Sequence, residues 1–228
     1  MLDRPTVGRY ICLTIALHKE VNMVRIVKKA SERRQEIINA AREHFQTQDY
    51  KKITMQDLMK KLNIAKGTIY HHFTSKSEIL EAVVEDMVDE ELVRKQDLLR
   101  KHQNLKALEK LTLLITESSM ADDNEKLLEN LHHPENSEIH TRQLARLLLK
   151  IAPLFASVIS EGCEQGVFKT RHPLECAEFL LAGVQFLTDI GFYPWDEEQL
   201  HRRAEAFPFL IETLLGAPTG SFDFLKNS

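Results

Sequence analysis

A polar segment in the first third of the chain holds the side chains best suited to chemistry, and that chemistry is contact with a nucleic acid. The segment places hydrogen-bond donors and positive charges around a single glycine: Lys66, Gly67, Thr68, Tyr70, His71, His72 and Lys76. Short or planar hydrogen-bonding groups read base edges in the major groove, whereas cations and hydroxyl groups bind phosphates. The segment therefore predicts a DNA contact surface.

The order of residues in this segment predicts which of them meet the bases. The N-terminal end of a recognition helix enters the major groove most deeply, and Lys66, Gly67 and Thr68 would occupy that end. Gly67 has no side chain to hold the backbone away from the duplex, and Thr68 offers a hydroxyl and a methyl group. Tyr70 and His72 follow, where they can donate to phosphate oxygens.

Three short helices must position these side chains. Apolar spacing predicts a helix over residues 31–46 capped by Ser31, a second helix capped by Thr54 and stopped at Asn63, and a third that holds the polar segment. Asp57, three residues after Thr54, completes a capping-box pattern. A short helix with a polar outer face that follows another after a tight turn is a helix-turn-helix.

The remaining chain also has helical periodicity. Ser75 and Ser77 open a long fourth helix that continues to about Leu99, and further patterns cover residues 105–119, 125–132, 138–165, 173–190 and 197–215. Aromatic residues are only 7% of the chain, which favours helix over strand. We therefore predict an all-α protein.

Charge is divided unevenly along the chain, although the net charge is only −4. Residues 23–80 hold 12 Lys and Arg against 6 Asp and Glu, whereas residues 81–228 hold 15 against 26. A basic segment joined to an acidic body indicates that one end meets a polyanion while the other stays away from it.

The segment and its surroundings resemble the DNA-binding signature of the TetR family of bacterial transcriptional regulators. The matching stretches are ITMQDL at 53–58 and IAKGTIYHHF at 64–73, followed by Lys76 and Leu80. The resemblance spans about fifty residues, from Glu32 to Leu80, and ISEGCEQGVF at 159–168 is similar to the end of a long helix in the family's C-terminal domain.

The resemblance implies two sets of DNA contacts. Phosphates would be anchored by Thr54, Tyr70, His72 and Lys76, and bases or the groove would be contacted by Lys66, Gly67, Thr68 and His71. Family members often carry a basic or polar residue where Met55 stands, and neighbouring Gln56 is the candidate in its place.

The resemblance also implies a cytoplasmic, homodimeric regulator, most often a repressor, with no membrane association. Its partners would be a palindromic double-stranded DNA operator, a second copy of the chain and a small-molecule effector bound between about residues 100 and 195. The expected divisions are an extension over 1–30, a DNA-binding domain over 31–80, a helical effector-binding and dimerisation domain over 81–215, and a loosely ordered tail over 216–228.

Two apolar faces are candidates for the dimer contact. One carries Phe179, Phe186 and Tyr193 around small residues, and the other carries residues 207, 210, 211 and 214. These faces can pack on each other, on the core or on a second copy. The four-helix interface between copies is the arrangement that the resemblance implies.

No catalytic, cofactor or metal site is expected. The sequence contains no nucleophile elbow, phosphate loop or CxxC pair. His132, His133, Glu135, His140 and His172 lack the spacing of a helical zinc site, and we interpret these histidines as solvated loop residues. Two alternatives stay open: a helical enzyme or scaffold carrying a helix-turn-helix, and a nucleoid-type protein without sequence preference.

Two further expectations concern the first residues of the chain and the charge of the effector. Lys19, Glu20 and Val21 are what a purine-rich ribosome-binding sequence would encode, so residues 1–22 are either an untranslated leader or a genuine arm. The acidic body favours a neutral or cationic effector, if carboxylates of Glu117, Glu161, Glu164, Glu178 and Asp189 border the cavity.

Overall fold

The computed structural model describes residues 29–117, 124–189 and 191–227 of the chain. The question of a leader or an arm over residues 1–22 falls outside these ranges. Every regular element in the described ranges is helical, which confirms the all-α fold class. The α-helices are α1 (Ala30–Thr47), α2 (Met55–Leu62), α3 (Lys66–His72), α4 (Lys76–Lys101), α5 (Ala107–Thr116), α6 (Glu125–Leu131), α7 (Ser137–Glu164), α8 (Pro173–Leu187) and α9 (Glu197–Leu215).

Local capping sets the turn between α2 and α3. The Thr54 hydroxyl oxygen accepts a hydrogen bond from the Asp57 amide at 3.2 Å, and the Asp57 carboxylate accepts one from the Thr54 amide at 2.9 Å. Asn63 ends α2 in the left-handed conformation, with φ of 50°. The predicted capping box and stop are thus confirmed, and they limit the connection to three residues.

The start of α1 differs from the prediction. The residue before the helix is Lys29, which makes no side-chain capping hydrogen bond, and Ser31 lies inside the first turn. Ser31 as the N-cap was therefore wrong by two residues, an error typical of helix ends.

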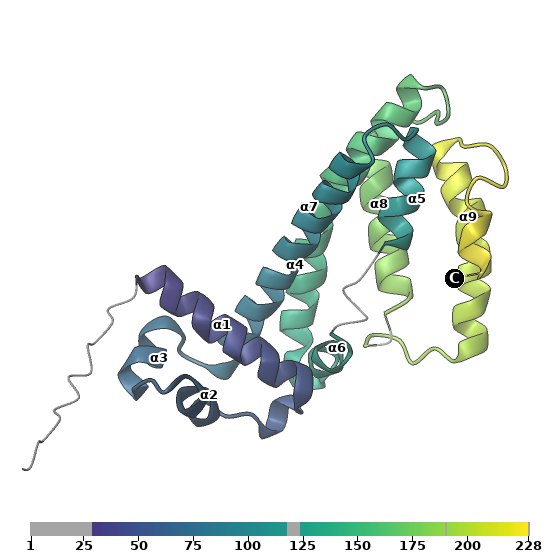
Figure 1. The fold of residues 1–228 in the computed structure, drawn as a ribbon. Helices are drawn as coiled ribbons and strands as arrows, with labels where there is room; N and C mark the ends of the chain where they lie inside the picture. The colour runs from purple at the N-terminus through teal and green to yellow at the C-terminus, as the bar shows by residue number, and fades with distance from the viewer. Residues whose placement is uncertain (1–28, 118–123, 190, 228) are drawn as a thin grey trace, which may run out of the picture.

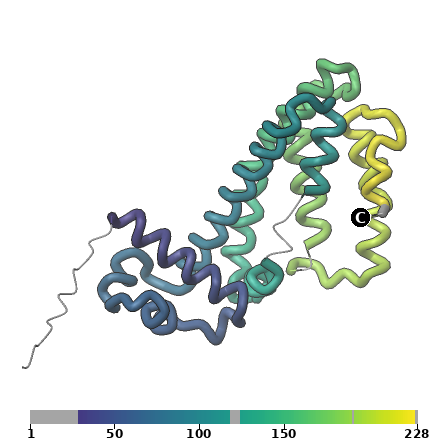
Figure 2. The backbone as a smooth tube through the Cα atoms, viewed as in Figure 1, coloured from purple at the N-terminus to yellow at the C-terminus, as the bar shows by residue number. Residues whose placement is uncertain are grey.

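Two apolar clusters divide the molecule. The first holds Phe45, Leu58, Ile69 and Phe73 with the start of α4, and it fixes α1, α2 and α3 at one end (Figure 1). The second lies among α5, α7, α8 and α9 at the other end. Figure 2 shows α4 running from the small end to the large one, so it links both clusters.

Three ion pairs join α4 to α7 at equal steps of four residues. Glu81 pairs with Arg142 at 2.9 Å, Glu85 with Arg146 at 3.5 Å and Asp89 with Lys150. Acids and bases follow in the same order along the chain, so the two helices run in the same direction (Figure 1). We call this set the α4–α7 ladder.

The apolar character of α7 has a structural explanation. Residues Pro134–Glu164 form the one helical run in the described ranges that is long and apolar enough to cross a membrane by composition alone. In the structure α7 packs against α4, α5 and α8, and Ile151, Phe155 and Ile159 are buried there. It is thus the central helix of the larger cluster.

The C-terminal segment is more ordered than expected. Phe222 is completely buried in the second cluster, and its amide donates to the Glu212 carboxylate at 3.2 Å. Gly216 ends α9 with φ of 61°, which turns the chain back along the helix. The expectation of a loosely ordered tail was therefore wrong, because Phe222 and Phe224 pack back into the second cluster.

Candidate nucleic-acid interface

The outer face of α3 carries the residues expected to meet DNA. Ile69 and Phe73 are buried in the first cluster and hold the opposite face of α3 toward the core. Of the remaining residues, Lys66, Gly67, Tyr70 and His71 are exposed, and Thr68 and His72 are half-buried. The structure thus brings these six residues together on one short helix that is open to a partner.

Gly67 is not required by anything inside the described chain. A Cβ atom added at Gly67 would meet no atom within 4 Å. Glycine costs helix stability of up to about 1 kcal/mol relative to alanine. A bare backbone at this position is therefore unexplained by packing, and it suits close approach by a partner.

Aromatic rings cluster along the same face. The Lys66 ammonium lies 5.6 Å from the Tyr70 ring centroid, and the His71 and His72 rings meet edge to face at 5.1 Å. Burial lowers the pKa of His72, and the neighbouring charges of His71, Arg33 and Arg34 lower it further. Both effects favour the neutral form of His72 in the free protein.

The two DNA-contact candidates at the start of α2, Thr54 and Gln56, differ in whether their side chains are already hydrogen-bonded within the capping box. The Thr54 hydroxyl donates to the Asp57 carboxylate at 2.6 Å, so its only proton is engaged within the capping box. Gln56 is exposed in the first turn of α2 and is free of that network. Contact of Thr54 with a phosphate would require the cap to give up one hydrogen bond.

Lys76 turns inward rather than toward solvent. Its ammonium donates to the carbonyl oxygen of Tyr50 at 2.5 Å and lies 3.8 Å from the centroid of the Tyr50 ring. Burial lowers the pKa of Lys76, while Glu135 and Asp49 raise it. The sequence did not predict this second role, in which Lys76 ties the start of α4 to the loop after α1.

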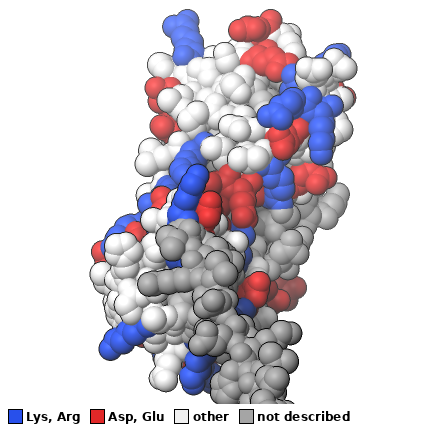
Figure 3. Space-filling model, turned by 60° about the vertical axis from the view of Figure 1, so that its left-hand side comes forward, with Lys and Arg blue, Asp and Glu red and all other residues white. Residues whose placement is uncertain are grey.

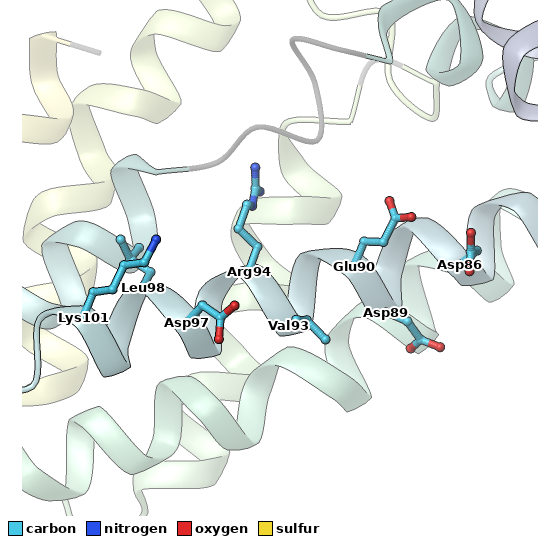
Figure 4. Close-up of a pocket in the computed structure, with 8 residues that line it drawn as sticks. All are labelled: Asp86, Asp89, Glu90, Val93, Arg94, Asp97, Leu98 and Lys101. Atoms are coloured by element: carbon cyan, nitrogen blue, oxygen red, sulfur yellow. The ribbon is translucent and has the colours of Figure 1, made fainter. Parts of the chain in front are cut away.

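Basic and acidic side chains alternate at mid-height on the face drawn in Figure 3. Among the ion pairs between α1 and α4, Arg42 pairs with Asp86 and with Glu90, each at 2.8 Å. These acids line a hollow of about 520 Å³ along α4 (Figure 4). The residues that line this hollow all belong to α4, and we assign no ligand to it.

A larger cavity lies inside the C-terminal helices. It has a volume of about 690 Å³ and takes its wall from α4, α5, α7, α8 and α9 and from the end of α6. Most of the wall is apolar, including Leu111, Leu147, Ile151, Phe155, Leu181 and Ile211. Pockets of this size and character bind small molecules.

A buried ion pair lies in the cavity wall. The Lys95 ammonium is 3.2 Å from the Glu91 carboxylate and donates to the carbonyl oxygen of Leu114 at 2.6 Å. Burial lowers the pKa of Lys95 to about 8. The group is still mostly protonated at pH 7, so it offers a positive charge to the cavity.

Two histidines and one carboxylate meet at another part of the wall. His140 is only 4% exposed and its Nε2 lies 3.0 Å from Asp189, while His132 Nε2 lies 3.7 Å from the same carboxylate. Burial lowers the pKa of His140, although Asp189 opposes this shift. The interpretation of His140 as a solvated loop residue was therefore wrong: His140 belongs to α7 and faces the interior.

Five carboxylates were predicted to border the cavity and so to favour a neutral or cationic effector. Of these five, only Asp189 lines the cavity. Glu161 pairs with Lys110 at 2.7 Å on the outside of α5 and α7, and Glu117 and Glu164 are exposed. The premise was thus wrong for four of the five residues, because a helical position alone does not tell which face meets a cavity.

The two predicted apolar faces behave differently. On α8, Phe179 is 71% exposed and Phe186 is 45% exposed, beside a hollow of about 390 Å³ that includes Ala182 and Gly183. On α9, Phe207 and Ile211 turn into the cavity wall, whereas residues 209 and 210 are more than half exposed. The predicted α8 face is therefore exposed in the single chain, whereas part of the predicted α9 face packs into the cavity wall.

These features define a class of protein: a regulator of transcription that binds DNA through a helix-turn-helix and carries a helical domain with a cavity. Residues 37–83 match the sequence profile of bacterial regulatory proteins of the tetR family. Residues 119–209 match that of the tetracyclin repressor-like C-terminal domain. The chain belongs to the TetR family.

Named relatives agree with this class. The chain is 26% identical over 201 residues to YfiR of Bacillus subtilis, an uncharacterised HTH-type transcriptional regulator, which covers 85% of this chain and 97% of YfiR. It is 28% identical over 148 residues to the HTH-type transcriptional repressor KstR2 of Mycolicibacterium smegmatis, covering 60% and 68%.

A solved structure shares the fold. The transcriptional regulator from Cytophaga hutchinsonii has a TM-score of 0.58 and 19% identity, covering 85% of this chain and 96% of that one. Together with the family assignment, this makes the protein a DNA-binding transcriptional regulator.

Sequence reasoning placed Asp189 at the cavity but missed Glu91 and Lys95 and the pairing of Asp189 with His140. Lys95 and Glu91 follow the four-residue spacing of an ordinary surface pair, and Asp189 lies 49 positions beyond His140. No local pattern joins such distant residues, so only the fold reveals them.

Proposed function

We propose that the protein is a homodimeric repressor that binds a palindromic operator through α3 and releases it when a small molecule occupies the cavity. The observation that carries the proposal is that one chain combines a bare, exposed Gly67 on a helix-turn-helix with a cavity of about 690 Å³. The site of action would be the cytoplasm, where bacterial DNA lies.

On DNA, the exposed N-terminal end of α3 would enter the major groove. Lys66, Gly67 and Thr68 would contact bases or the groove together with His71, and Gln56 would reach from α2. Phosphates would be bound by Tyr70, His72, Thr54 and Lys76. For Lys76 this requires that its ammonium leave the Tyr50 carbonyl or contact a phosphate from its present position.

Two copies would associate through the apolar face of α8. Exposed aromatic side chains next to small residues are typical of a surface that packs against another helix. A two-fold dimer presents two copies of α3, so its operator would be palindromic.

The helix α6 offers a route between the cavity and the DNA-binding end. Leu128 of α6 and His132, which follows α6, line the cavity. Between them, the buried Asn130 side chain accepts from the Tyr50 amide at 2.8 Å and donates to the carbonyl oxygens of Phe45 and Gln48 at 2.9 and 3.0 Å. A ligand that moves α6 would therefore move the end of α1, in addition to any effect through α4.

The effector would have an apolar body and a polar end. The apolar wall suits the body, and Gln143 and the Glu91–Lys95 pair offer polar contacts. Because this pair presents both signs of charge, the cavity no longer favours a cation over an anion. Thermal shift with lipophilic cations, acyl-chain acids and aromatic acids would identify the class, since a ligand at a hundred times its Kd stabilises the folded state by about 2.7 kcal/mol.

Selection of bound DNA from a random pool tests the proposal directly. A single palindromic motif is the expected result, and effector addition should release it. Thr68→Ala and Lys66→Ala should change sequence preference. Tyr70→Phe and Lys76→Ala should weaken binding to all sequences about equally, and Lys76→Ala should lower the salt slope by about one.

Two results would favour the other candidate functions. Equal affinity for random and selected DNA would indicate a nucleoid-type protein. Chemical turnover of a cavity ligand would indicate an enzyme carrying a helix-turn-helix. We assign no catalytic residue and no cofactor to this chain.

A further inference from the structure

Three side chains with metal-ligating atoms converge at the wall of the cavity. They come from three separate elements: His132 follows α6, His140 lies in the second turn of α7, and Asp189 follows α8. One ligating atom from each residue lies within 4.8 Å of the others. Such convergence from distant parts of the chain is a property of the fold and not of a local run of acidic or histidine residues.

The separations are close to those of a metal centre. Ligands about 2.0–2.2 Å from a tetrahedral zinc ion lie roughly 3.3–3.6 Å from one another. Here His140 Nε2 is 3.0 Å from Asp189 Oδ2, His132 Nε2 is 3.7 Å from Asp189 Oδ1, and the three ligating atoms all lie within 4.8 Å of one another. Rotation of the side chains would have to bring one carboxylate oxygen and both imidazole nitrogens to similar separations around an ion.

The surrounding backbone holds the cluster in place. The Gly191 amide donates to Asp189 Oδ1 at 2.8 Å. A Cβ atom at Gly191 would lie 2.5 Å from the His132 ring, so only glycine allows this approach. The ring of Phe192 stacks on that of His140 at 4.9 Å. Supporting contacts of this kind orient the ligands of a metal site.

The charge of the cluster also requires a cation. The Asp189 side chain is only 8% exposed, and its recorded ion-pair partners among the described residues are His132 and His140. A buried carboxylate is costly unless positive charge accompanies it. That charge is either a proton on one of the imidazoles or a metal ion.

We propose that His132, His140 and Asp189 bind one divalent transition-metal ion of the zinc class at the wall of the cavity. Two imidazoles and a carboxylate suit zinc, cobalt or nickel, whereas magnesium and calcium prefer oxygen ligands. Three protein ligands leave a coordination position for water or for a donor atom of a molecule in the cavity. The site belongs to the isolated protein and does not depend on whether an effector releases DNA.

The test is metal titration of the full-length protein after treatment with a chelator. Co²⁺ should bind at one ion per chain with a visible absorption band, and Zn²⁺ should displace it. Asp189→Asn keeps an acceptor for the Gly191 amide. Asp189→Asn and His132→Gln, made separately, should each weaken Zn²⁺ binding at least tenfold. His133→Gln is the matched control, because His133 neighbours the cluster but approaches Glu135, at 3.9 Å.

A second measurement guards against misfolded variants. Zn²⁺ should raise the Tm of the wild-type and His133→Gln proteins and leave that of a folded Asp189→Asn protein unchanged. Absence of stoichiometric Co²⁺ and Zn²⁺ binding by the wild-type protein would overturn the proposal. Binding that survives both Asp189→Asn and His132→Gln would do so too, and the cluster would then be a hydrogen-bonded histidine–aspartate pair.

Discussion

At Gly67, a single substitution should raise the stability of the protein and lower its affinity for DNA. Gly67→Ala introduces a methyl group that meets nothing inside the described chain. We expect the free energy of unfolding in urea to rise by up to about 1 kcal/mol, because alanine favours helix. Affinity for the operator, measured by fluorescence anisotropy, should fall at least tenfold, because the methyl group holds the backbone away from the groove.

The control for this variant is Gly183→Ala, since Gly183 is the other helix-interior glycine whose added Cβ meets no neighbour. It should give a similar gain in helix stability. Because Gly183 lies on the proposed α8 dimer face, this comparison applies to the free energy of unfolding and not to operator affinity. Unchanged operator affinity of Gly67→Ala would show that DNA does not approach α3 at this point.

His72 should make operator binding sensitive to pH. Its pKa is lowered in the free protein by burial and by neighbouring positive charge, and a bound phosphate would raise it. Binding then takes up protons, so affinity should increase as pH falls from about 7.5 to 6, by at most tenfold per unit for one proton. Binding isotherms across this range measure the effect.

The pH effect should disappear in His72→Gln and persist in His102→Gln, since His102 ends α4 far from α3. A pH dependence that His72→Gln leaves intact would assign the proton to another group.

Residue types and spacing predicted the exposed face of α3, because α3 is a local element and its buried residues follow helical periodicity. They did not predict that the Lys76 ammonium bonds to Tyr50, because this contact joins residues 26 positions apart through a loop. The contacts of each residue with DNA stay predictions.

At the scale of elements, α6 is joined to the end of α1 by the buried side chain of Asn130. Asn130→Ala would leave the Tyr50 amide and the Phe45 carbonyl without their hydrogen-bond partner. We expect the free energy of unfolding to fall by about 1–3 kcal/mol, because buried polar groups lose their partners. The effector should still bind, but its effect on operator affinity should decrease.

Lys126→Ala on the outer side of α6 provides the comparison, since Lys126 makes a largely exposed ion pair with Glu129 of the same helix. It should change stability by less than about 0.5 kcal/mol. If Asn130→Ala were as mild as Lys126→Ala, the bonds from α6 to the end of α1 would not be needed for stability.

Periodicity and caps predicted every one of the α-helices, with ends within about three residues for most of them. The approximate end of α8 was predicted at 190, whereas the helix ends at Leu187. The relation between helices was beyond such reasoning. The α4–α7 ladder and the His132–His140–Asp189 cluster depend on tertiary packing that no helical pattern specifies.

For the whole molecule, the exposed face of α8 predicts its state of association. Phe179→Asp should convert the dimer to a monomer in analytical ultracentrifugation, because a buried charge would replace an aromatic contact. The fold should survive, since Phe179 is 71% exposed in the single chain. Operator affinity should fall, because two half-sites would no longer be bound together.

Val93→Asp tests whether an aspartate at any exposed apolar position would disrupt the dimer. Val93 is 55% exposed, but it lies on α4 rather than on the α8 face. It should leave the dimer intact. Should both variants remain dimeric, the association surface would lie elsewhere on the chain.

The α4–α7 ladder does not by itself fix the register of the two helices. Acids and bases both repeat every four residues, so a slide of α7 by four residues, about 6 Å, would place Arg142 opposite Glu85 and Arg146 opposite Asp89. Within the ladder such a slide costs one partly exposed pair, about 0–1 kcal/mol. The register must therefore be selected by the other contacts of α7, which are its apolar packing and the pairs that Glu161 makes with Lys110 and His140 makes with Asp189.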